Sequence, residues 1–398
     1  MRLCTVMWLA ALANAAMAMP AAAADPEPIR IAHVHGKTGP FQALAGDTQK
    51  GLLLGLEYAT QGTMAIDGRK IVVIEKDDQL KPEMGRTLLA EAFGDDHADI
   101  AVGDVASNVA LAMLPVALEY KKIIIIEPAV ADTITGKDWN RYVFRTGRNS
   151  SQDAISSAVA LGKPGVVIGT LAQDYAYGRD GIAAFRTALK PTGAEMVAEE
   201  YAPFAATDLT ASAQRLFDAM KDKPGKKIIF VLWAGSVDAV GLLKRQLPER
   251  YGIELAAVGS FFNAMIAYKA IPGMEGSTYY YYGIPKNPVN DWLVKVHQER
   301  FGGPPDFFTA GGMAAGIAIV EGIRKAGGTD SEKLVAAMEG MSFETPKGTM
   351  MFRAQDHQAL QAMYHFRIGV DPALAWGVPE LIRTIGIGDM DVPIGNKR

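Results

Sequence analysis

Short apolar runs alternate with longer amphipathic segments along most of the chain. In the first part, strands are predicted at "IRIAHV" (29–34), "KIVVIE" (70–75), "IAVG" (100–103), "KIIIIE" (122–127) and "RYVFRT" (141–146). Helices are predicted between them at about 46–58, from Pro82 to about 93, and from Ser107. Continuous Val and Ile runs separated by helices are typical of parallel strands covered on both faces. The first part therefore predicts one parallel sheet between helices.

A second set of the same kind begins at "NSSQDAISSAVAL" (149–161), where Asn149 or Ser150 suits a helix N-cap. Strands follow at "GVVIGT" (165–170), "EMVAEEY" (195–201), "KKIIFVLW" (226–233) and "ELAAVG" (254–259). Helices are predicted after Gly178, at 208–220, at 237–247 and near Asn263. Two such sets predict an α/β fold with two Rossmann-like, doubly wound lobes.

The chain continues after both sets are complete. "STYYYYG" (277–283) reads as a strand, two helical segments follow, and "GTMMFR" (348–353) and "ALQAMYHFRIG" (359–369) are again strand-like. We therefore expect the chain to cross back between its lobes. The predicted N-terminal lobe comprises 25–148 plus about 283–345, and the C-terminal lobe comprises 149–282 plus about 346–398.

The N-terminus has the pattern of a secretory signal peptide, 1–24, with Arg2, an apolar stretch and cleavage after Ala24. The alternative is an apolar helix that stays attached. Cys4 is the only cysteine, so the mature chain would have no disulfide. No later run of 18 uninterrupted apolar residues occurs, so we expect a periplasmic protein that does not insert into the membrane once the signal is removed.

Charge and motifs argue against several function classes. The formal net charge is −4, without a basic tail, which argues against nucleic-acid binding. Gly-x-Ser-x-Gly, Gly-x-Gly-x-x-Gly and Walker-type sequences are absent, so an enzyme has little support. His33 and His35 share a strand face and allow a metal geometrically, but no matching ligand cluster follows, and a place at a strand end is the alternative. We expect no metal, no cofactor and no enzymatic activity.

Several strings, in their order and spacing, resemble the type I periplasmic solute-binding proteins, in particular the leucine/isoleucine/valine and amide receptors of ABC importers. They include "IRIAHVHGKTGPFQALAGDTQKGLLLGLEY" (29–58), "GDVASNVALAMLP" (103–115), "FRTGRNSSQ" (144–152) and "DYAYGRDG" (174–181), and together they span nearly the whole mature chain. The resemblance implies two lobes joined by three crossovers, a ligand in the cleft between them, and closure by hinge bending.

The same resemblance implies the site residues. Ser107, with Asn108 beside it, occupies the turn whose serine and N–H groups hold the ligand carboxylate in amino-acid receptors. Ala131 stands at or near the position of the usual threonine. Tyr177 keeps the family's Tyr-Gly turn, and Trp233 lies in the following site turn.

The acidic residue that commonly pairs with a ligand ammonium is replaced here by "SFFN" (260–263), which contains Phe261 and Phe262. Burying an ammonium without a counter-charge costs several kcal/mol, whereas a cation–π contact returns roughly 0.5–2 kcal/mol. Arg148 is a candidate partner for an acid group of the ligand. The alternative is that Arg148 is an exposed residue of the hinge. Phe41 would complete an aromatic wall.

These expectations lead to a monomeric receptor that delivers a small molecule to a membrane ABC permease. The differences from the amino-acid receptors at the site positions favour a small hydrophobic or aromatic carboxylate as the ligand. Two alternatives stay open at this point: a branched-chain or other apolar amino acid as the ligand, and a sensing subunit for a membrane kinase.

Overall fold

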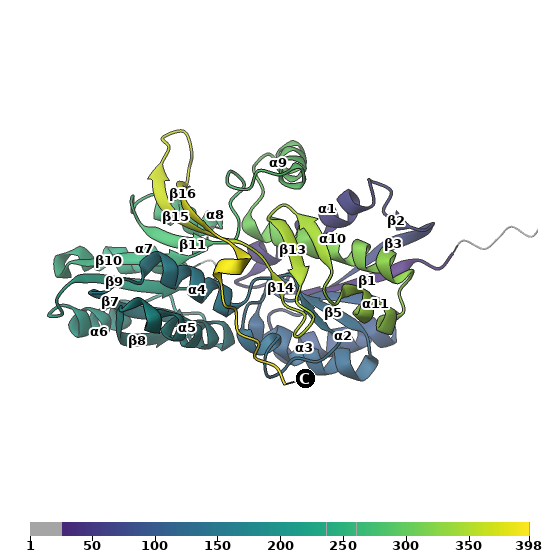
Figure 1. The fold of residues 1–398 in the computed structure, drawn as a ribbon, viewed down its shortest axis with the longest axis horizontal. Coiled ribbons are helices and arrows are strands. Elements are labelled where there is room, and N and C mark those ends of the chain that lie inside the picture. The colour runs from purple at the N-terminus through teal and green to yellow at the C-terminus, as the bar shows by residue number, and fades with distance from the viewer. Residues whose placement is uncertain (1–25, 236, 260, 398) are drawn as a thin grey trace, which may run out of the picture.

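The computed structural model describes residues 26–235, 237–259 and 261–397 (Figure 1). The predicted signal peptide, 1–24, lies outside the described residues. Two large sheets flanked by helices lie side by side, one in each half of the ribbon in Figure 1. The predicted α/β fold with two doubly wound lobes is confirmed.

The first sheet has the strand order β2-β3-β1-β4-β5-β6 and is parallel except where the short β2 pairs with β3. Helices α1 and α10 pack against one another, and α2 packs against α3 and β1. All four isoleucines of β5 are buried, as expected for a strand covered on both faces. The elements are β1 (Ile29–His35), α1 (Gln42–Ala59), β2 (Ala65–Ile66), β3 (Arg69–Asp77), α2 (Pro82–Gly94), β4 (Ile100–Gly103), α3 (Ser107–Tyr120), β5 (Ile123–Ile126) and β6 (Val143–Arg145).

The second sheet has the order β16-β15-β11-β10-β9-β7-β8, and its last two strands in sequence are antiparallel. The side chain of Asn149 caps α4 by accepting from the N–H of Gln152, as the sequence predicts. The elements are α4 (Ser150–Leu161), β7 (Val166–Gln173), α5 (Ala176–Leu189), β8 (Glu195–Ala202), α6 (Thr210–Met220), β9 (Lys226–Leu232), α7 (Ala239–Arg245), β10 (Ile253–Val258), α8 (Phe262–Tyr268), β11 (Glu275–Thr278), β15 (Met363–Val370) and β16 (Gly377–Ile385).

The chain passes between the lobes after β6, after β11, and between β14 and β15. The intervening elements are α9 (Pro288–Phe301), α10 (Phe307–Ala326), α11 (Ser331–Met338), β12 (Ser342–Thr345), β13 (Gly348–Phe352) and β14 (Ala359–Leu360). Strands β12, β13 and β14 form a third small sheet, and α10 packs against β12. The exact residue limits of the two lobes stay a prediction.

The tyrosine run after β11 differs from the sequence prediction. The predicted strand 277–283 ends at Thr278, and Tyr279 and Tyr280 lie buried in the second crossover. Their hydroxyl groups donate to the carbonyl of Phe307 (2.9 Å) and to Oδ1 of Asn290 (2.8 Å). These long-range partners lie on α9 and α10, so the run leaves the sheet although its residue types favour strands.

Helices α1 and α10 approach closely because glycines face the contact. A Cβ atom on Gly51 would lie 2.0 Å from the carbonyl oxygen of Thr309, and one on Gly312 would lie 2.1 Å from that of Thr48. Helix α10 has the length and mean hydropathy (1.2) of a membrane-spanning helix, but 89% of its apolar window is buried inside the molecule. It is the central core helix of the first lobe.

Replacing Gly51 by alanine should therefore destabilise the protein, because the new methyl group meets backbone that cannot step aside. We expect a loss of about 1–3 kcal/mol in the free energy of unfolding, measured by urea denaturation. The matched control is Gly46→Ala on the same helix, where nothing lies within 4 Å of the new Cβ. It should gain roughly 0.5–1 kcal/mol. Equal effects of the two substitutions would contradict the close packing.

The rings of His33 and His35 stack at the end of β1, 4.0 Å apart between centroids. Nδ1 of His33 contacts Oε1 of Gln49. Burial lowers the pKa of His33 well below its usual value, and the neighbouring His35 lowers it further. The folded state therefore keeps His33 neutral at a pH where the unfolded chain binds a proton.

Because the unfolded state binds more protons, stability should fall as the pH drops below about 6.5, the pKa of an unperturbed histidine. We expect His33→Gln to lose less stability than the wild type between pH 7.5 and pH 5, measured by urea denaturation at both values. The control is the same substitution at the exposed His97. If the pH dependence of stability is unchanged in His33→Gln, protonation of His33 is not its cause.

Candidate functional site

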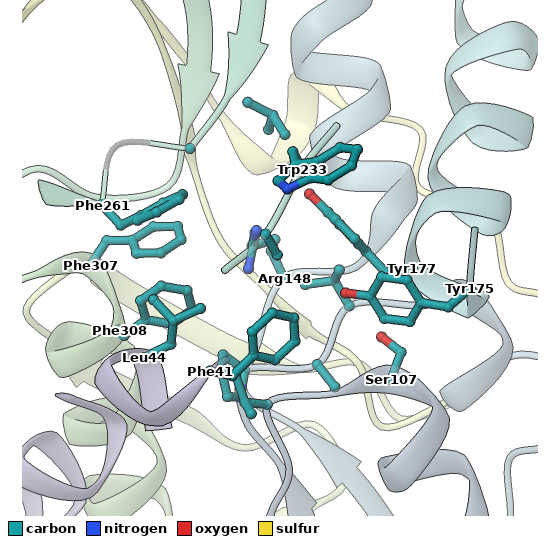
Figure 2. A pocket seen from close by; sticks show the side chains of 17 residues that line it. Phe41, Leu44, Ser107, Arg148, Tyr175, Tyr177, Trp233, Phe261, Phe307 and Phe308 are labelled. Atoms are coloured by element: carbon teal, nitrogen blue, oxygen red, sulfur yellow. The ribbon is translucent and has the colours of Figure 1, made fainter. Parts of the chain in front are cut away.

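A cavity lies where the carboxyl ends of strands from both lobes meet, with about 460 Å³ of space when the open solvent at its mouth is included (Figure 2). Turns after β1, β4 and β5 supply one side, turns after β7, β9 and β10 supply the other, and the start of α10 closes a third. Ligands of open α/β sheets bind beyond these strand ends. The cavity is lined by Phe41, Leu44, Val105, Ser107, Pro128, Ala129, Val130, Arg148, Tyr175, Tyr177, Trp233, Ala234, Val258, Gly259, Phe261, Phe307 and Phe308.

Ser107 is the first residue of α3 and is buried at the edge of the cavity. Its Oγ accepts a hydrogen bond from the backbone N–H of Ala131 at 3.2 Å, so its own O–H can donate to a ligand. The N–H groups of Val109 and Ala110 donate to the carbonyl of Ala106, each at 3.0 Å. The N–H groups of Ser107 and Asn108 have no acceptor within the helix and carry the positive end of the helix dipole. This corner of the cavity suits a carboxylate.

Arg148 lies on the first crossover and is only 6% exposed. Its Nε lies 3.1 Å from Oδ1 of Asp153, and its guanidinium stands 5.0 Å from the ring of Tyr279 and 5.2 Å from that of Phe307. Burial opposes the charge, but Asp153 outweighs it and raises the pKa of Arg148. Arg148 is therefore a permanent cation in the wall of the cavity.

Aromatic rings form most of the remaining wall (Figure 2). Phe41 comes from the first lobe, and its ring packs edge-on against Phe204 of the second, with centroids 5.2 Å apart. A Cβ atom on Gly235 would lie 2.7 Å from the ring of Phe41, and Gly235 has φ +97°. The absence of a side chain at Gly235 thus lets the first lobe close against the turn that follows β9.

Tyr175 and Tyr177 enter the cavity from the start of α5. Burial raises the pKa of both phenols, so they stay protonated and act as neutral donors or acceptors. Trp233 is 7% exposed, and its Nε1 has no hydrogen-bond partner among the described residues. The wall therefore offers polar groups without adding a further charge.

Six residues that the sequence singled out line the cavity: Phe41, Ser107, Arg148, Tyr177, Trp233 and Phe261. Asn108, Ala131 and Phe262 do not. Ala131 is fully buried behind Ser107, because its N–H bonds to that hydroxyl and its carbonyl accepts from Arg145 at 2.7 Å.

The other two residues are held away from the cavity by the first turn of a helix. Asn108 follows Ser107 in α3 and is half-buried outside the lining. Phe262 begins α8, and its ring packs on Trp376 at 4.7 Å instead of joining Phe261. Successive residues at a helix start point in different directions, so only one of each pair faces the cavity.

Sequence analysis missed three aromatic lining residues: Tyr175, Phe307 and Phe308. Tyr175 lies two positions before Tyr177 in the same turn, a spacing that places both near the cavity. Phe307 and Phe308 follow Asp306, whose Oδ1 accepts from the N–H of Phe308 and caps α10. That cap marks a helix start, but only the tertiary fold brings the helix start to the cleft. Within the described part of the chain, no three His, Cys, Asp or Glu side chains are placed to hold a metal.

Comparison with known proteins agrees with this geometry. The model of a family described as periplasmic binding protein matches residues 28–371. The chain belongs to the periplasmic binding protein family. A crystal structure of an ABC-type branched-chain amino acid transporter from Rhodopseudomonas palustris CGA009 is 63% identical to this periplasmic binding protein, with a TM-score of 0.83, and the match covers 93% of this chain and 100% of the other.

Two further relatives are more distant. A leucine-, isoleucine-, valine-, threonine- and alanine-binding protein from Pseudomonas aeruginosa is 27% identical over 356 residues, which is 86% of this periplasmic binding protein and 90% of the relative. A solute binding protein from Rhodopseudomonas palustris BisB5, solved in complex with 3,4-dihydroxybenzoic acid, has a TM-score of 0.77 at 24% identity, covering 92% of this chain and 99% of the other. The second of these similarities shows the fold alone.

The buried ion pair gives a prediction about stability. Asp153→Asn should destabilise this periplasmic binding protein by about 3–5 kcal/mol, because it leaves the charge of Arg148 buried without its partner. The double variant Arg148→Met with Asp153→Asn removes both charges and should recover part of the loss. Urea denaturation of the wild type and of the two variants measures this. If the double variant is less stable than Asp153→Asn, Asp153 does not stabilise the protein by compensating the charge of Arg148.

Proposed function

We propose that this protein is the ligand-binding subunit of an ABC importer, that it acts in the periplasm, and that it holds a small aromatic or hydrophobic carboxylate between its lobes. It performs no chemistry on the ligand. Closure of the lobes around the ligand forms the surface that the membrane permease recognises.

The charge of the cavity wall is the observation that carries this proposal. Arg148 is the only charged side chain among the described lining residues, and no carboxylate lines the cavity. An ammonium group would therefore be buried without a counter-charge, at a cost of several kcal/mol. A carboxylate instead meets Ser107, the start of α3 and the field of Arg148.

The shape and composition of the wall support an aromatic or hydrophobic body for the ligand. The rings of Phe41, Phe261 and Phe308 enclose the cavity with aliphatic and aromatic surface. Aromatic pairs in offset or edge-to-face arrangements contribute about 0.5–1.5 kcal/mol each beyond their burial. The relative that holds 3,4-dihydroxybenzoic acid illustrates that a fold of this type can enclose an aromatic acid.

A branched-chain amino acid is the second candidate, and one observation favours it. The relative at 63% identity is described as a branched-chain amino acid transporter, and such identity over the whole length commonly accompanies a shared ligand class. In that case the ammonium must be held by the hydroxyl groups of Tyr175 or Tyr177 and by ring faces, without a carboxylate. Cation–π attraction supplies roughly 0.5–2 kcal/mol for this.

A thermal-shift experiment separates the two candidates. At a ligand concentration of 100 times Kd the folded state gains about 2.7 kcal/mol, which raises the Tm by several degrees. We expect benzoate and 3-phenylpropanoate to raise the Tm and leucine, isoleucine and valine to leave it unchanged. Stabilisation by leucine alone would replace the proposed ligand class by the second candidate.

The role of Ser107 is tested by Ser107→Ala. Loss of one hydrogen bond to a charged group costs about 1.5–3 kcal/mol, so affinity for the carboxylate should fall more than tenfold in isothermal titration. The matched control is Ser156→Ala, a buried serine on α4 whose hydroxyl donates to the carbonyl of Asp153 at 3.0 Å. It should leave ligand affinity within twofold. Similar losses in both variants would indicate a structural effect instead.

A further inference from the structure

A second cavity adjoins the first on the side of the second lobe, with about 380 Å³ of space when open solvent is included. Trp233 and Phe261 line both cavities, so these two side chains form the boundary between them. Beyond the boundary, the wall is made by the turn after β9 and by helices α7 and α8. Asp238, Asn263 and Tyr268 contribute polar groups to it.

The boundary contains a buried hydrogen-bond donor without an acceptor. Nε1 of Trp233 has no partner among the described residues, although the side chain is more than nine-tenths buried. Figure 2 shows this nitrogen directed toward the interior of the site. Buried donors are rarely left unpaired in folded proteins. A ligand atom that accepts a hydrogen bond at this point would satisfy it.

Ser107 and Trp233 lie at opposite ends of the labelled residues in Figure 2. A ligand whose carboxylate binds at Ser107 therefore directs its other end toward Trp233 and Phe261. A benzoate would end within the first cavity. A longer acid would pass the boundary and place its far end among the polar groups of the second cavity.

We propose that the two cavities form one elongated binding site and that the ligand is an arylpropanoate or arylpropenoate with a hydroxyl group on its ring. This inference rests on the proposed function, because it takes the carboxylate to bind at Ser107. The ring hydroxyl accepts from Nε1 of Trp233 and donates to Asp238 or Asn263. The second cavity thus selects for the length of the acid and for the substituent at its far end.

The experiment compares acids of increasing length by isothermal titration with the full mature chain: benzoate, 3-phenylpropanoate and 3-(4-hydroxyphenyl)propanoate. Ala264 lines the second cavity and not the first. Ala264→Leu fills the second cavity, and the control is Ala270→Leu, at an exposed position just after α8. Binding of benzoate by each variant also reports that it is folded.

We expect the hydroxylated propanoate to bind the wild type at least tenfold more tightly than benzoate. Ala264→Leu should lose this tenfold advantage while its affinity for benzoate changes less than twofold, and Ala270→Leu should match the wild type. If the long acids bind no better than benzoate, or if Ala264→Leu leaves their affinity unchanged, the second cavity plays no part and only the proposed function stands. If no aromatic acid binds, the elongated site and the aromatic ligand class of the proposed function are both wrong.

Discussion

The buried pair of Arg148 and Asp153 is the interaction on which the arrangement of the lobes depends most. Arg148 lies on the first crossover and Asp153 in the first turn of α4, so the pair fixes how the second lobe begins. The guanidinium also faces Tyr279 of the second crossover and Phe307 at the start of α10. One cation therefore links the start of α4 to two segments that are remote in sequence, and the same cation forms part of the cavity wall.

Further buried charges surround this pair behind the cavity. Lys347 lies on the turn between β12 and β13, and its Nζ is 4.6 Å from the centre of the Tyr279 ring. Burial lowers the pKa of Lys347 to about 8. Burial raises the pKa of Glu127, while Lys347 acts in the opposite direction. Oε2 of Glu127 accepts from Thr146 at 2.9 Å. Polar groups are thus concentrated where the chain crosses between lobes, and apolar groups line most of the cavity.

The periodicity of the sequence predicted the fold well because strands of parallel sheets are buried on both faces. The run "IIII" of β5 has no other stable location in a protein of this composition. The tyrosine run was predicted wrongly because its conformation depends on contacts with distant segments. Its residue types favour a strand, but hydrogen bonds from Tyr279 and Tyr280 to α9 and α10 hold it in the crossover. Such partners become visible only when distant segments are brought together.

The lining residues on turns that follow strands could be predicted from the sequence, and those on other elements could not. Phe41, Ser107 and Trp233 follow strand ends, which converge in any doubly wound fold. Phe307 and Phe308 begin a helix that returns from the second crossover, and no local pattern shows that its first turn meets the cleft.

The division of charge explains how a cleft with a permanent cation can close around a ligand. Asp153 balances Arg148, so the cavity wall does not hold an isolated charge. A carboxylate that enters brings one negative charge, and hydrogen bonds from Ser107 and the free N–H groups at the start of α3 replace part of its hydration. An ammonium would find no carboxylate in the cavity, because Asp153 is not a lining residue and the described wall apart from Arg148 is neutral. The proposed selectivity for an anion therefore follows from where the chain places the carboxylate that compensates Arg148, beside the arginine but not in the cavity lining.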